Sequence, residues 1–114
     1  MFIYYNRGFY YHNLGNYRQA IEDYNRAIEI KPGYAWAYLN RGNAYNLLGD
    51  YKKAIENFDR VIEIKPGFAL AYNNRGAAYL MLGNKDFGCP DAQKACSLGK
   101  CQALEFAKGK GYCR

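Results

Sequence analysis

Residues 35–68 read AWAYLNRGNAYNLLGDYKKAIENFDRVIEIKPGF, and this stretch decides the fold. The block before it, residues 1–34, repeats it in phase and is identical at more than half of its positions. Residues 69–102 follow the same pattern as far as Gly83 and then diverge. A repeat of this length indicates a stack of similar supersecondary units that bury a continuous core together.

The pattern within each block predicts two helices. In the second half of the quoted block the apolar residues share one helical stripe: Tyr51, Ala54, Ile55, Phe58, Val61 and Ile62. Charged residues occupy the opposite side, which we interpret as a solvated face. Gly15 and Gly49 are expected to end the first helices in a left-handed conformation. Asn16 and Asp50 are expected to cap the second helices, which end before the Lys-Pro-Gly turns because proline disfavours helix at the preceding residue.

Glycine recurs in the middle of each first helix, as Gly8, Gly42 and Gly76. Glycine costs about 1 kcal/mol relative to alanine inside a helix. A cost repeated at one phase predicts that a neighbouring helix passes very close. Ala20 and Ala54 are the expected facing residues.

These residues resemble the tetratricopeptide repeat family. The matching positions of the quoted block are Tyr38, Gly42, Tyr45, Gly49, Ala54, Phe58, Val61 and Pro66. Those of the first block are Tyr4, Gly8, Tyr11, Gly15, Ala20, Tyr24, Ala27 and Pro32. Position 7, usually leucine in the family, is arginine in all three blocks.

The resemblance covers residues 1–98 and implies an all-α fold. The expected architecture is a right-handed superhelix of antiparallel helical hairpins with a concave face. We divide the chain into repeat 1 (1–34), repeat 2 (35–68), a divergent repeat 3 (69–98) and a capping helix with a cysteine-containing tail (99–114). The usual role of the family is to bind segments of other proteins, so the expected partner is a protein or peptide.

In this family the concave groove is lined mainly by the first helix of each hairpin. Carried over, the candidate groove residues are Tyr5, Asn6, Phe9, His12, Asn13, Trp36, Leu39, Asn40, Asn43, Asn46, Asn73 and Asn74. Asparagine offers a donor and an acceptor to an extended backbone, and aromatic side chains supply anchors. The alternative for the apolar positions Phe2, Leu39 and Leu70 is simple packing between helices.

Some family members act as chaperone adaptors and grip a C-terminal carboxylate with lysine, asparagine and arginine at fixed groove positions. The corresponding residues here are Tyr5, Phe9, Asn40, Leu70 and Asn74, and only Asn40 matches. We therefore expect the ligand to be an internal, polar and aromatic-compatible segment rather than a charged C-terminus.

All four cysteines lie between residues 89 and 113, and three uses compete. Their spacing is a poor match to a zinc site and contains no C-x-x-C redox motif. Free buried thiols are the remaining alternative to disulfides. Nested disulfides Cys89–Cys113 and Cys96–Cys101 fit best if the last two helices pack antiparallel. Disulfides imply an oxidising compartment, hence periplasmic or secreted residence, and reduced thiols would imply the cytoplasm.

The same segment predicts the end of the fold. Pro90 is tolerated in the first turn of a helix, so the second helix of repeat 3 is expected to start near Cys89. Gly99 should end it. A last helix over Lys100–Lys108, ended by Gly109, should cover the last hairpin.

Several function classes are disfavoured. The chain has one histidine, His12, and no pairing of a base with a nucleophile, so catalysis, a cofactor and a metal are not expected. The net charge is +6, but basic residues are scattered among acidic ones, so nucleic-acid binding is not expected. No run approaches the roughly 20 apolar residues that span a bilayer, and residues 1–5 lack the basic lead of a signal peptide. The alternative function is self-association through the apolar first helix, at Met1, Phe2, Ile3 and Tyr4.

Overall fold

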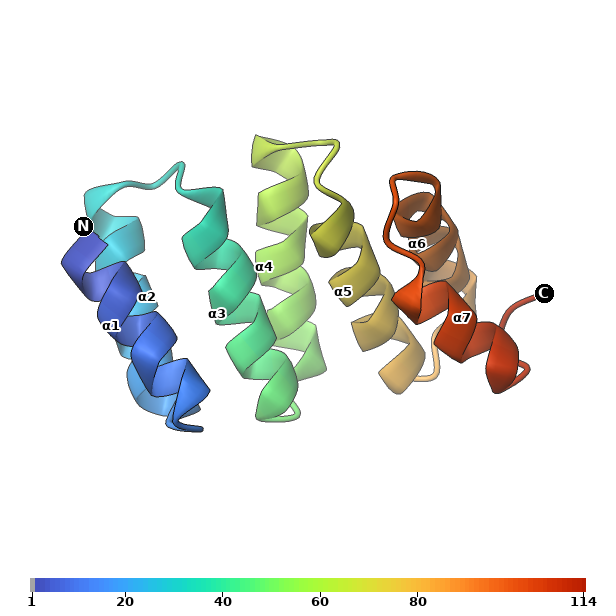
Figure 1. Cartoon of the computed structure of the whole chain (residues 1–114), viewed down its shortest axis with the longest axis horizontal. Coiled ribbons are helices and arrows are strands. Elements are labelled where there is room, and N and C mark those ends of the chain that lie inside the picture. The colour runs from blue at the N-terminus through green and yellow to red at the C-terminus, as the bar shows by residue number, and fades with distance from the viewer. Residues whose placement is uncertain (1) are drawn as a thin grey trace.

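The computed structural model describes residues 2–114 as seven helices, and Met1 lies outside the described residues. The helices are α1 (Phe2–Asn13), α2 (Tyr17–Ile30), α3 (Ala35–Leu47), α4 (Tyr51–Ile64), α5 (Ala69–Met81), α6 (Lys85–Ser97) and α7 (Gln102–Gly109). No strand occurs in this part of the chain. Helices α1 to α6 form three antiparallel hairpins stacked in a right-handed superhelix, and α7 caps the last of them (Figure 1).

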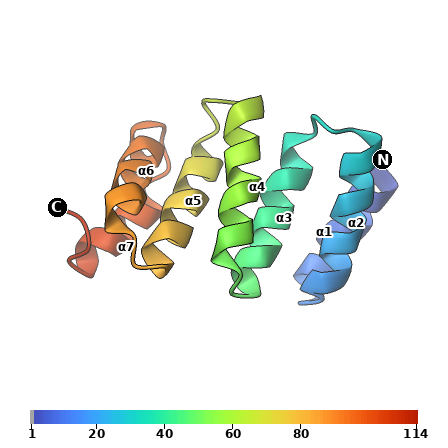
Figure 2. The same cartoon turned by 180° about the vertical axis from the view of Figure 1, so that it is seen from behind.

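The helices form two layers. Helices α1, α3, α5 and α7 make the inner layer, nearer the viewer in Figure 1. Helices α2, α4 and α6 make the outer layer, which is nearer the viewer in Figure 2. The stack measures 43 × 26 × 20 Å. The core runs between the layers, where Leu39, Phe58 and Val61 are among the most completely buried large side chains.

The mid-helix glycines mark a close approach, as predicted, but the facing group differs from the expectation. A Cβ added to Gly42 would lie 2.6 Å from the ring of Phe58, and one added to Gly8 would lie 2.8 Å from the ring of Tyr24. The added Cβ would therefore clash first with an aromatic ring, and not with the alanine. The carbonyl oxygen of Ala20 comes next, at 3.2 Å from the same added atom at Gly8.

The third hairpin packs more tightly still. Here Gly88 and Ala92 occupy the positions of the alanine and the aromatic residue in the first two hairpins. A Cβ added to Gly76 would lie 3.0 Å from the backbone nitrogen of Ala92 and 3.1 Å from the carbonyl oxygen of Gly88. Helices α5 and α6 therefore meet backbone to backbone.

Most of the predicted helix ends are confirmed. Gly15 and Gly49 adopt φ values of 82° and 83° at the ends of α1 and α3. The side chain of Asp50 accepts a hydrogen bond from the backbone N–H of Lys53 at 3.2 Å. The matching prediction for Asn16 is wrong, because its side chain makes no capping hydrogen bond.

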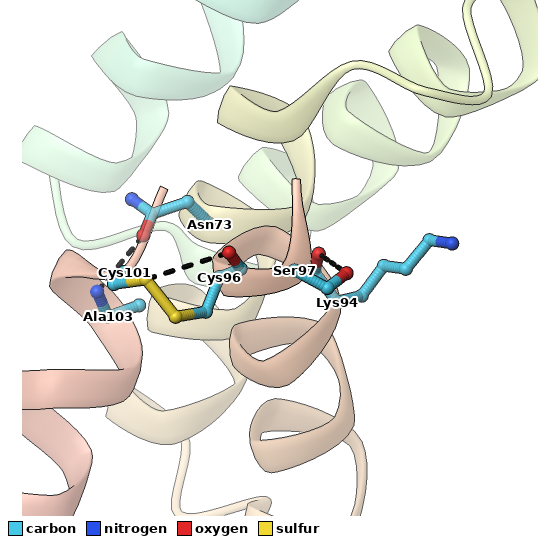
Figure 3. Close-up of a disulfide and its surroundings, with 6 residues drawn as sticks. All are labelled: Asn73, Lys94, Cys96, Ser97, Cys101 and Ala103. Carbon is cyan, nitrogen blue, oxygen red and sulfur yellow. Dashed lines mark hydrogen bonds between the residues drawn. A yellow bond between two sulfur atoms is a disulfide. The ribbon is translucent and has the colours of Figure 1, made fainter. Parts of the chain in front are cut away.

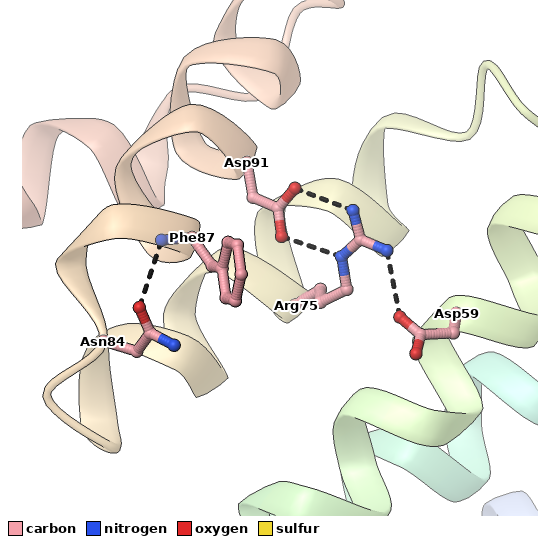
Figure 4. A network of polar contacts seen from close by, with 5 residues as sticks. All are labelled: Asp59, Arg75, Asn84, Phe87 and Asp91. Carbon is pink, nitrogen blue, oxygen red and sulfur yellow. Dashed lines mark hydrogen bonds and ion pairs between the residues drawn. The ribbon is translucent and has the colours of Figure 1, made fainter.

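The predicted start of α6 near Cys89 is also wrong. The helix begins at Lys85, after Asn84 accepts a hydrogen bond from the N–H of Phe87 at 3.2 Å (Figure 4). Pro90 thus lies inside the helix, where it has no N–H for the carbonyl of Asp86. The arrangement is tolerated because both residues are exposed and water can reach that carbonyl.

The last helix is shifted as well. Helix α7 runs over Gln102–Gly109 rather than Lys100–Lys108. Gly109 is its last residue rather than its stop, and the left-handed residue that follows is Gly111, with φ 75°.

Arginines at repeat position 7 join the hairpins. Arg75 donates from Nε and Nη2 to Asp91 in its own hairpin, at 2.7 and 2.8 Å. It also donates from Nη1 to Asp59 of the preceding hairpin at 2.9 Å (Figure 4). Arg7 makes the same two-pronged contact with Asp23, at 2.8 and 2.8 Å. Asp23 and Asp91 are buried, so these two carboxylates do not belong to the solvated outer face.

Two disulfides hold the C-terminal cap. They join Cys89 to Cys113 and Cys96 to Cys101, the second at the turn between α6 and α7 (Figure 3). The side chains of Leu80, Ala107 and Cys113 form a small buried cluster under the cap, with Cys89 and Leu104 packed against it. Helix α7 therefore covers apolar surface that the last hairpin would otherwise expose.

Candidate peptide-binding groove

The candidate site is the groove face, which we define as the sides of α1, α3 and α5 that carry repeat positions 2, 5, 6, 9, 12 and 13. Hydrogen bonds between side chains link these helices. The amide of Asn40 donates to the hydroxyl of Tyr5 at 2.6 Å, and the amide of Asn74 donates to Asn43 Oδ1 at 2.8 Å. These bonds fix the register of neighbouring inner helices.

Asn73, a predicted groove residue, is engaged by the cap. Its Oδ1 accepts a hydrogen bond from the backbone N–H of Ala103 at 3.0 Å, in the first turn of α7 (Figure 3). Its amide nitrogen donates to Asn74 Oδ1 at 3.2 Å. The side chain thus satisfies a free helix N–H and links the cap to the groove face.

Large apolar side chains are exposed on this face. They come from all three inner helices: Phe2, Phe9, Trp36, Leu47 and Met81. Trp36 is 41% exposed and packs edge-to-face on Phe68, with ring centroids 5.1 Å apart. The indole is therefore held in place while part of its surface stays open to a ligand.

The apolar candidates divide between the groove and the core. Leu39 is only 2% exposed and belongs to the core cluster with Phe58, so packing between helices accounts for it. Leu70 is half-buried against the same cluster. Phe2, at 60% exposure, stays on the surface.

Polar candidates also differ in exposure. Asn6 and Asn13 are exposed, whereas His12 and Asn46 are half-buried at the same repeat position of α1 and α3. The Nδ1 atom of His12 and the Oδ1 atom of Asn46 are buried without a hydrogen-bond partner among the described residues. Burial lowers the pKa of His12, which favours the neutral ring at pH 7. Both atoms lie below the surface, so a ligand on this face reaches them only if the two side chains move.

Tyr5 lies at the edge of the same face and packs against Tyr34, with ring centroids 5.1 Å apart. Burial raises the pKa of Tyr5, and the neighbouring Tyr34 adds to the effect. The hydroxyl stays protonated over the physiological range and is available as a donor.

The sequence matches a known family over more than half of its length. A family model described as tetratricopeptide repeat matches residues 1–67. The chain belongs to the tetratricopeptide repeat family. Domains of this family are generally modules for protein interaction rather than catalysts. No curated protein sequence matches the chain significantly.

Solved structures of tetratricopeptide repeat domains share the fold. The first such domain of Spaghetti (RPAP3), bound to the HSP90 peptide SRMEEVD, has a TM-score of 0.90 at 22% identity, covering 95% of this chain and 87% of that one. The second domain of human RPAP3, in complex with the HSP70 peptide SGPTIEEVD, has a TM-score of 0.85 at 27% identity, covering 91% and 88%. The crystal structure of MamA has a TM-score of 0.80 at 34% identity, and this chain spans 59% of it.

This tetratricopeptide groove differs from a carboxylate-binding one in its charge. None of the groove positions of α1, α3 and α5 is Lys, Arg, Asp or Glu. The equivalents of the carboxylate grip are Tyr5, Phe9, Asn40, Leu70 and Asn74. The groove face is therefore neutral.

The arginine contacts at position 7 were missed from the sequence. A usable signal was present, because each of Arg7, Arg41 and Arg75 is followed sixteen residues later by Asp or Asn. That spacing reaches from the first helix of a hairpin to the second.

Among residues 2–114, no group of three or more His, Cys, Asp or Glu side chains is placed to hold a metal ion. None of the described helices has the length and apolar character needed to cross a membrane.

Proposed function

We propose that this chain is a non-catalytic scaffold that holds an uncharged internal segment of a partner protein on the groove face. The observation that carries the proposal is a row of exposed apolar side chains beside half-buried amides, on a face with no charged residue. An exposed apolar patch of this kind, rimmed by polar groups, is typical of an interaction site.

The ligand should be uncharged because the groove cannot compensate a charge. A charged side chain placed against Trp36 or Phe9 would lose hydration and gain no partner of opposite sign. The exposed amides of Asn6 and Asn13 offer donors and acceptors that suit the backbone of a bound segment. Aromatic and aliphatic side chains of that segment would pack on the exposed rings.

The peptides seen on the RPAP3 domains provide a useful contrast. Both end in EEVD, with two glutamates and an aspartate. A groove without Lys or Arg offers these groups no partner, so we expect SRMEEVD to bind this chain only weakly.

The single tryptophan makes the proposal testable. Trp36 is the only tryptophan in the chain and lies on the groove face, so a ligand that covers it should shift its fluorescence to the blue. Peptides selected from an array on the immobilised chain would be titrated in solution with this readout. We expect uncharged sequences with spaced aromatic or aliphatic residues, and no dependence on a free C-terminus.

Matched variants separate the groove from the rest of the surface. Phe9→Ala removes an exposed groove ring and should weaken binding about tenfold or more, the range of an interface anchor. Phe87→Ala removes a ring of similar exposure, 59%, from α6 outside the groove and should leave binding unchanged. Equal losses from both variants, or strict dependence on a terminal carboxylate, would overturn the proposal.

The second candidate function is self-association through the side of α1 that faces away from the stack. Ile3 and Tyr10 are 77% and 61% exposed, whereas the equivalent residues of α3, Ala37 and Ala44, are fully buried by the preceding hairpin. The side of α1 that faces away from the stack thus leaves bulky apolar groups uncovered. Light scattering over a range of concentrations tests this role. A monomer at all concentrations removes it, and a dimer lost in Ile3→Ser supports it.

The cysteine pairs bear on the compartment. We propose that the chain works in an oxidising compartment, periplasmic or secreted, because disulfides persist there and are rare in the cytoplasm. The intact mass of the purified native protein after alkylation without reductant tests this. Unlabelled cysteines support the proposal, and four labelled cysteines would place the chain in a reducing compartment.

A further inference from the structure

Arg41 holds the same repeat position as Arg7 and Arg75 but lies in a different electrostatic environment. Its Nε donates to Asn57 Oδ1 at 2.6 Å, and its Nη1 donates to Asn25 Oδ1 at 2.8 Å. Both partners are neutral amides, and no carboxylate within residues 2–114 pairs with this guanidinium. A half-buried positive charge is therefore left without a counter-ion.

Two residue changes produce this difference. The second-helix residue that is Asp23 in hairpin 1 and Asp91 in hairpin 3 is Asn57 in hairpin 2. The residue contributed by the preceding hairpin is Asp59 at the next junction and Asn25 at this one. The arginine is kept while both acidic partners are replaced.

The pKa values of the guanidinium groups reflect the same contrast. Burial lowers the pKa of Arg41. The pKa of Arg75 is raised, mainly by its hydrogen bond to Asp91. Arginine still stays charged at neutral pH, so Arg41 carries its charge without the compensation that Arg75 receives.

Arg41 lines an open pocket of about 460 Å³ between the first two hairpins. The pocket is walled by α2, α3 and α4, and its outer walls α2 and α4 belong to the layer nearer the viewer in Figure 2. Nη2 of Arg41 donates to none of the described residues. Lys53 also lines the pocket, with its ammonium 5.5 Å from the centre of the Tyr45 ring, and Glu29 and Glu56 complete the charged lining.

The side chain of Asn57, the neutral partner of Arg41 in the same hairpin, is fixed in its orientation. The amide nitrogen of Asn57 donates to the carbonyl of Lys53 at 2.8 Å, so its oxygen points at Arg41. Asn57 is buried, which holds this arrangement in place. The free side of the guanidinium is therefore preorganised for a ligand.

We propose that this pocket binds a carboxylate, with Arg41 as its anchor. Asp23 shows that a carboxylate here can accept two hydrogen bonds from one guanidinium, through Nε and Nη2 of Arg7, but at Arg41 the Nε is already taken by Asn57. A ligand carboxylate at Arg41 would take the free Nη2 and the second hydrogen of Nη1. The charges of the pocket lining sum to zero, so the hydrogen-bond geometry of Arg41 rather than net charge selects the ligand.

The carboxylate has two sources with the same chemistry. One is an aspartate or glutamate side chain of a partner protein docked on the outer layer, and the other is a small free carboxylate. Neither overlaps the groove face, because the α3 residues of the pocket, Arg41 and Tyr45, hold repeat positions 7 and 11, so this site is independent of the proposed peptide binding.

Side-chain NMR of the intact protein tests the proposal directly. Sodium acetate would be titrated against sodium chloride at equal ionic strength while the Nε–H signals of the arginines are followed. We expect the Arg41 signal to move and saturate, and the Arg75 signal, already paired with Asp91 and Asp59, to stay in place. Equal movement of both signals, or movement of neither, overturns the site.

Asn57→Asp supplies the missing carboxylate from within and should close the site. We expect the acetate response of Arg41 to weaken at least about tenfold, and the variant to melt at a higher temperature than the wild type without acetate. A response equal to that of the wild type would overturn the proposal. So would an Arg41 signal that moves in Glu56→Gln without any ligand, because it would identify the counter-ion as the chain's own Glu56.

Two blocked pentapeptides distinguish the sources. Acetyl-Gly-Gly-Glu-Gly-Gly-amide and its Gln counterpart differ only in the carboxylate. If the Glu peptide binds more tightly than acetate, the natural ligand is a protein side chain; if the two are equal, a small carboxylate suffices. Binding by the Gln peptide at the same strength overturns the requirement for a carboxylate.

Discussion

The first two hairpins and the third reach the same geometry by different means. In hairpins 1 and 2 an aromatic ring, Tyr24 or Phe58, lies against the mid-helix glycine of the partner helix. In hairpin 3 that position is Ala92, and the helix backbones meet directly. Both disulfides join α6 to the C-terminal cap and neither joins α5 to α6. A repeat that lacks the aromatic ring can thus keep its hairpin through direct contact between the helix backbones, while the disulfides secure its second helix to the cap.

The largest effect is expected when the aromatic ring of Phe58 is removed from its contact with Gly42 in hairpin 2. Phe58 is fully buried, so Phe58→Ala should leave a cavity and reduce the free energy of unfolding by about 3–5 kcal/mol. Urea denaturation measures the loss. Phe87→Ala, on the exposed side of α6, is the matched control and should change stability by less than about 1 kcal/mol. A small effect of Phe58→Ala would mean that backbone contact alone holds hairpin 2.

The next effect concerns the disulfide that closes the longer loop. Replacing Cys89 and Cys113 by serine should reduce stability by about 3 kcal/mol, because the bond closes a loop with a sequence separation of 24. Hydrogen exchange should locate the loss in α6 and α7 and leave α2 and α4 protected. The control pair Cys96 and Cys101, with a separation of 5, should have an effect of about 2 kcal/mol. Uniform loss over the whole chain would contradict a local role.

Most of the fold was predictable because the first-helix pattern occurs three times and the second-helix pattern with its Lys-Pro-Gly stop occurs twice. A periodic apolar stripe, a glycine at each first-helix end and a Lys-Pro-Gly stop are local signals, and their repetition confirms each one. The start of α6 was missed where repetition ends, because the rule for proline outweighed the cap signal of Asn84. Asn84 stands where Asn16 and Asp50 stand in the other repeats, so the phase of the repeat was the better guide.

The candidate groove stays a prediction based on repeat position, and the contacts of its residues could not be predicted. Family phase placed Trp36 and Phe9 on one face, but it gave no means of knowing that Asn73 is taken up by α7. That contact joins residues thirty positions apart and depends on the divergent C-terminal segment. The arginine contacts were missed for a related reason, because an arginine at a position usually occupied by leucine is explained only by its partner on the next helix, which the sixteen-residue spacing identifies.

Substitution of Pro90 tests the same comparison between hairpin 3 and the first two hairpins, with a smaller expected effect. Pro90→Ala should raise the free energy of unfolding by about 1–3 kcal/mol, because alanine restores a donor for the carbonyl of Asp86 and favours the helix. Denaturation with the disulfides intact measures the gain. Pro66→Ala, in a turn outside any helix, is the control and should give no gain. If Pro90→Ala is neutral or destabilising, α6 starts after Asp86, near Cys89.

The smallest effect is expected for Tyr24→Phe, a substitution that makes hairpin 1 resemble hairpin 2 at this position. Tyr24 is fully buried, and its hydroxyl has no hydrogen-bond partner among the described residues. Tyr24→Phe should therefore stabilise the chain by about 1 kcal/mol at pH 7, by removing an unsatisfied polar group. Urea denaturation at neutral pH measures the gain, and Phe58 shows that the phenyl ring fits this position in the neighbouring hairpin.

The same variant has a signature in its pH dependence. Burial raises the pKa of Tyr24 well above its usual value near 10, so the unfolded chain loses this proton at a lower pH than the folded one. Stability should fall as the pH rises above about 10, since ionisation then favours the unfolded state. In Tyr24→Phe that fall should be shallower, and the remainder would belong to other buried hydroxyls such as Tyr5. If Tyr24→Phe is less stable than the wild type at pH 7 and loses as much stability above about pH 10, the Tyr24 hydroxyl is hydrogen-bonded to water. Tyr24 would then contribute a hydrogen bond that Phe58 does not.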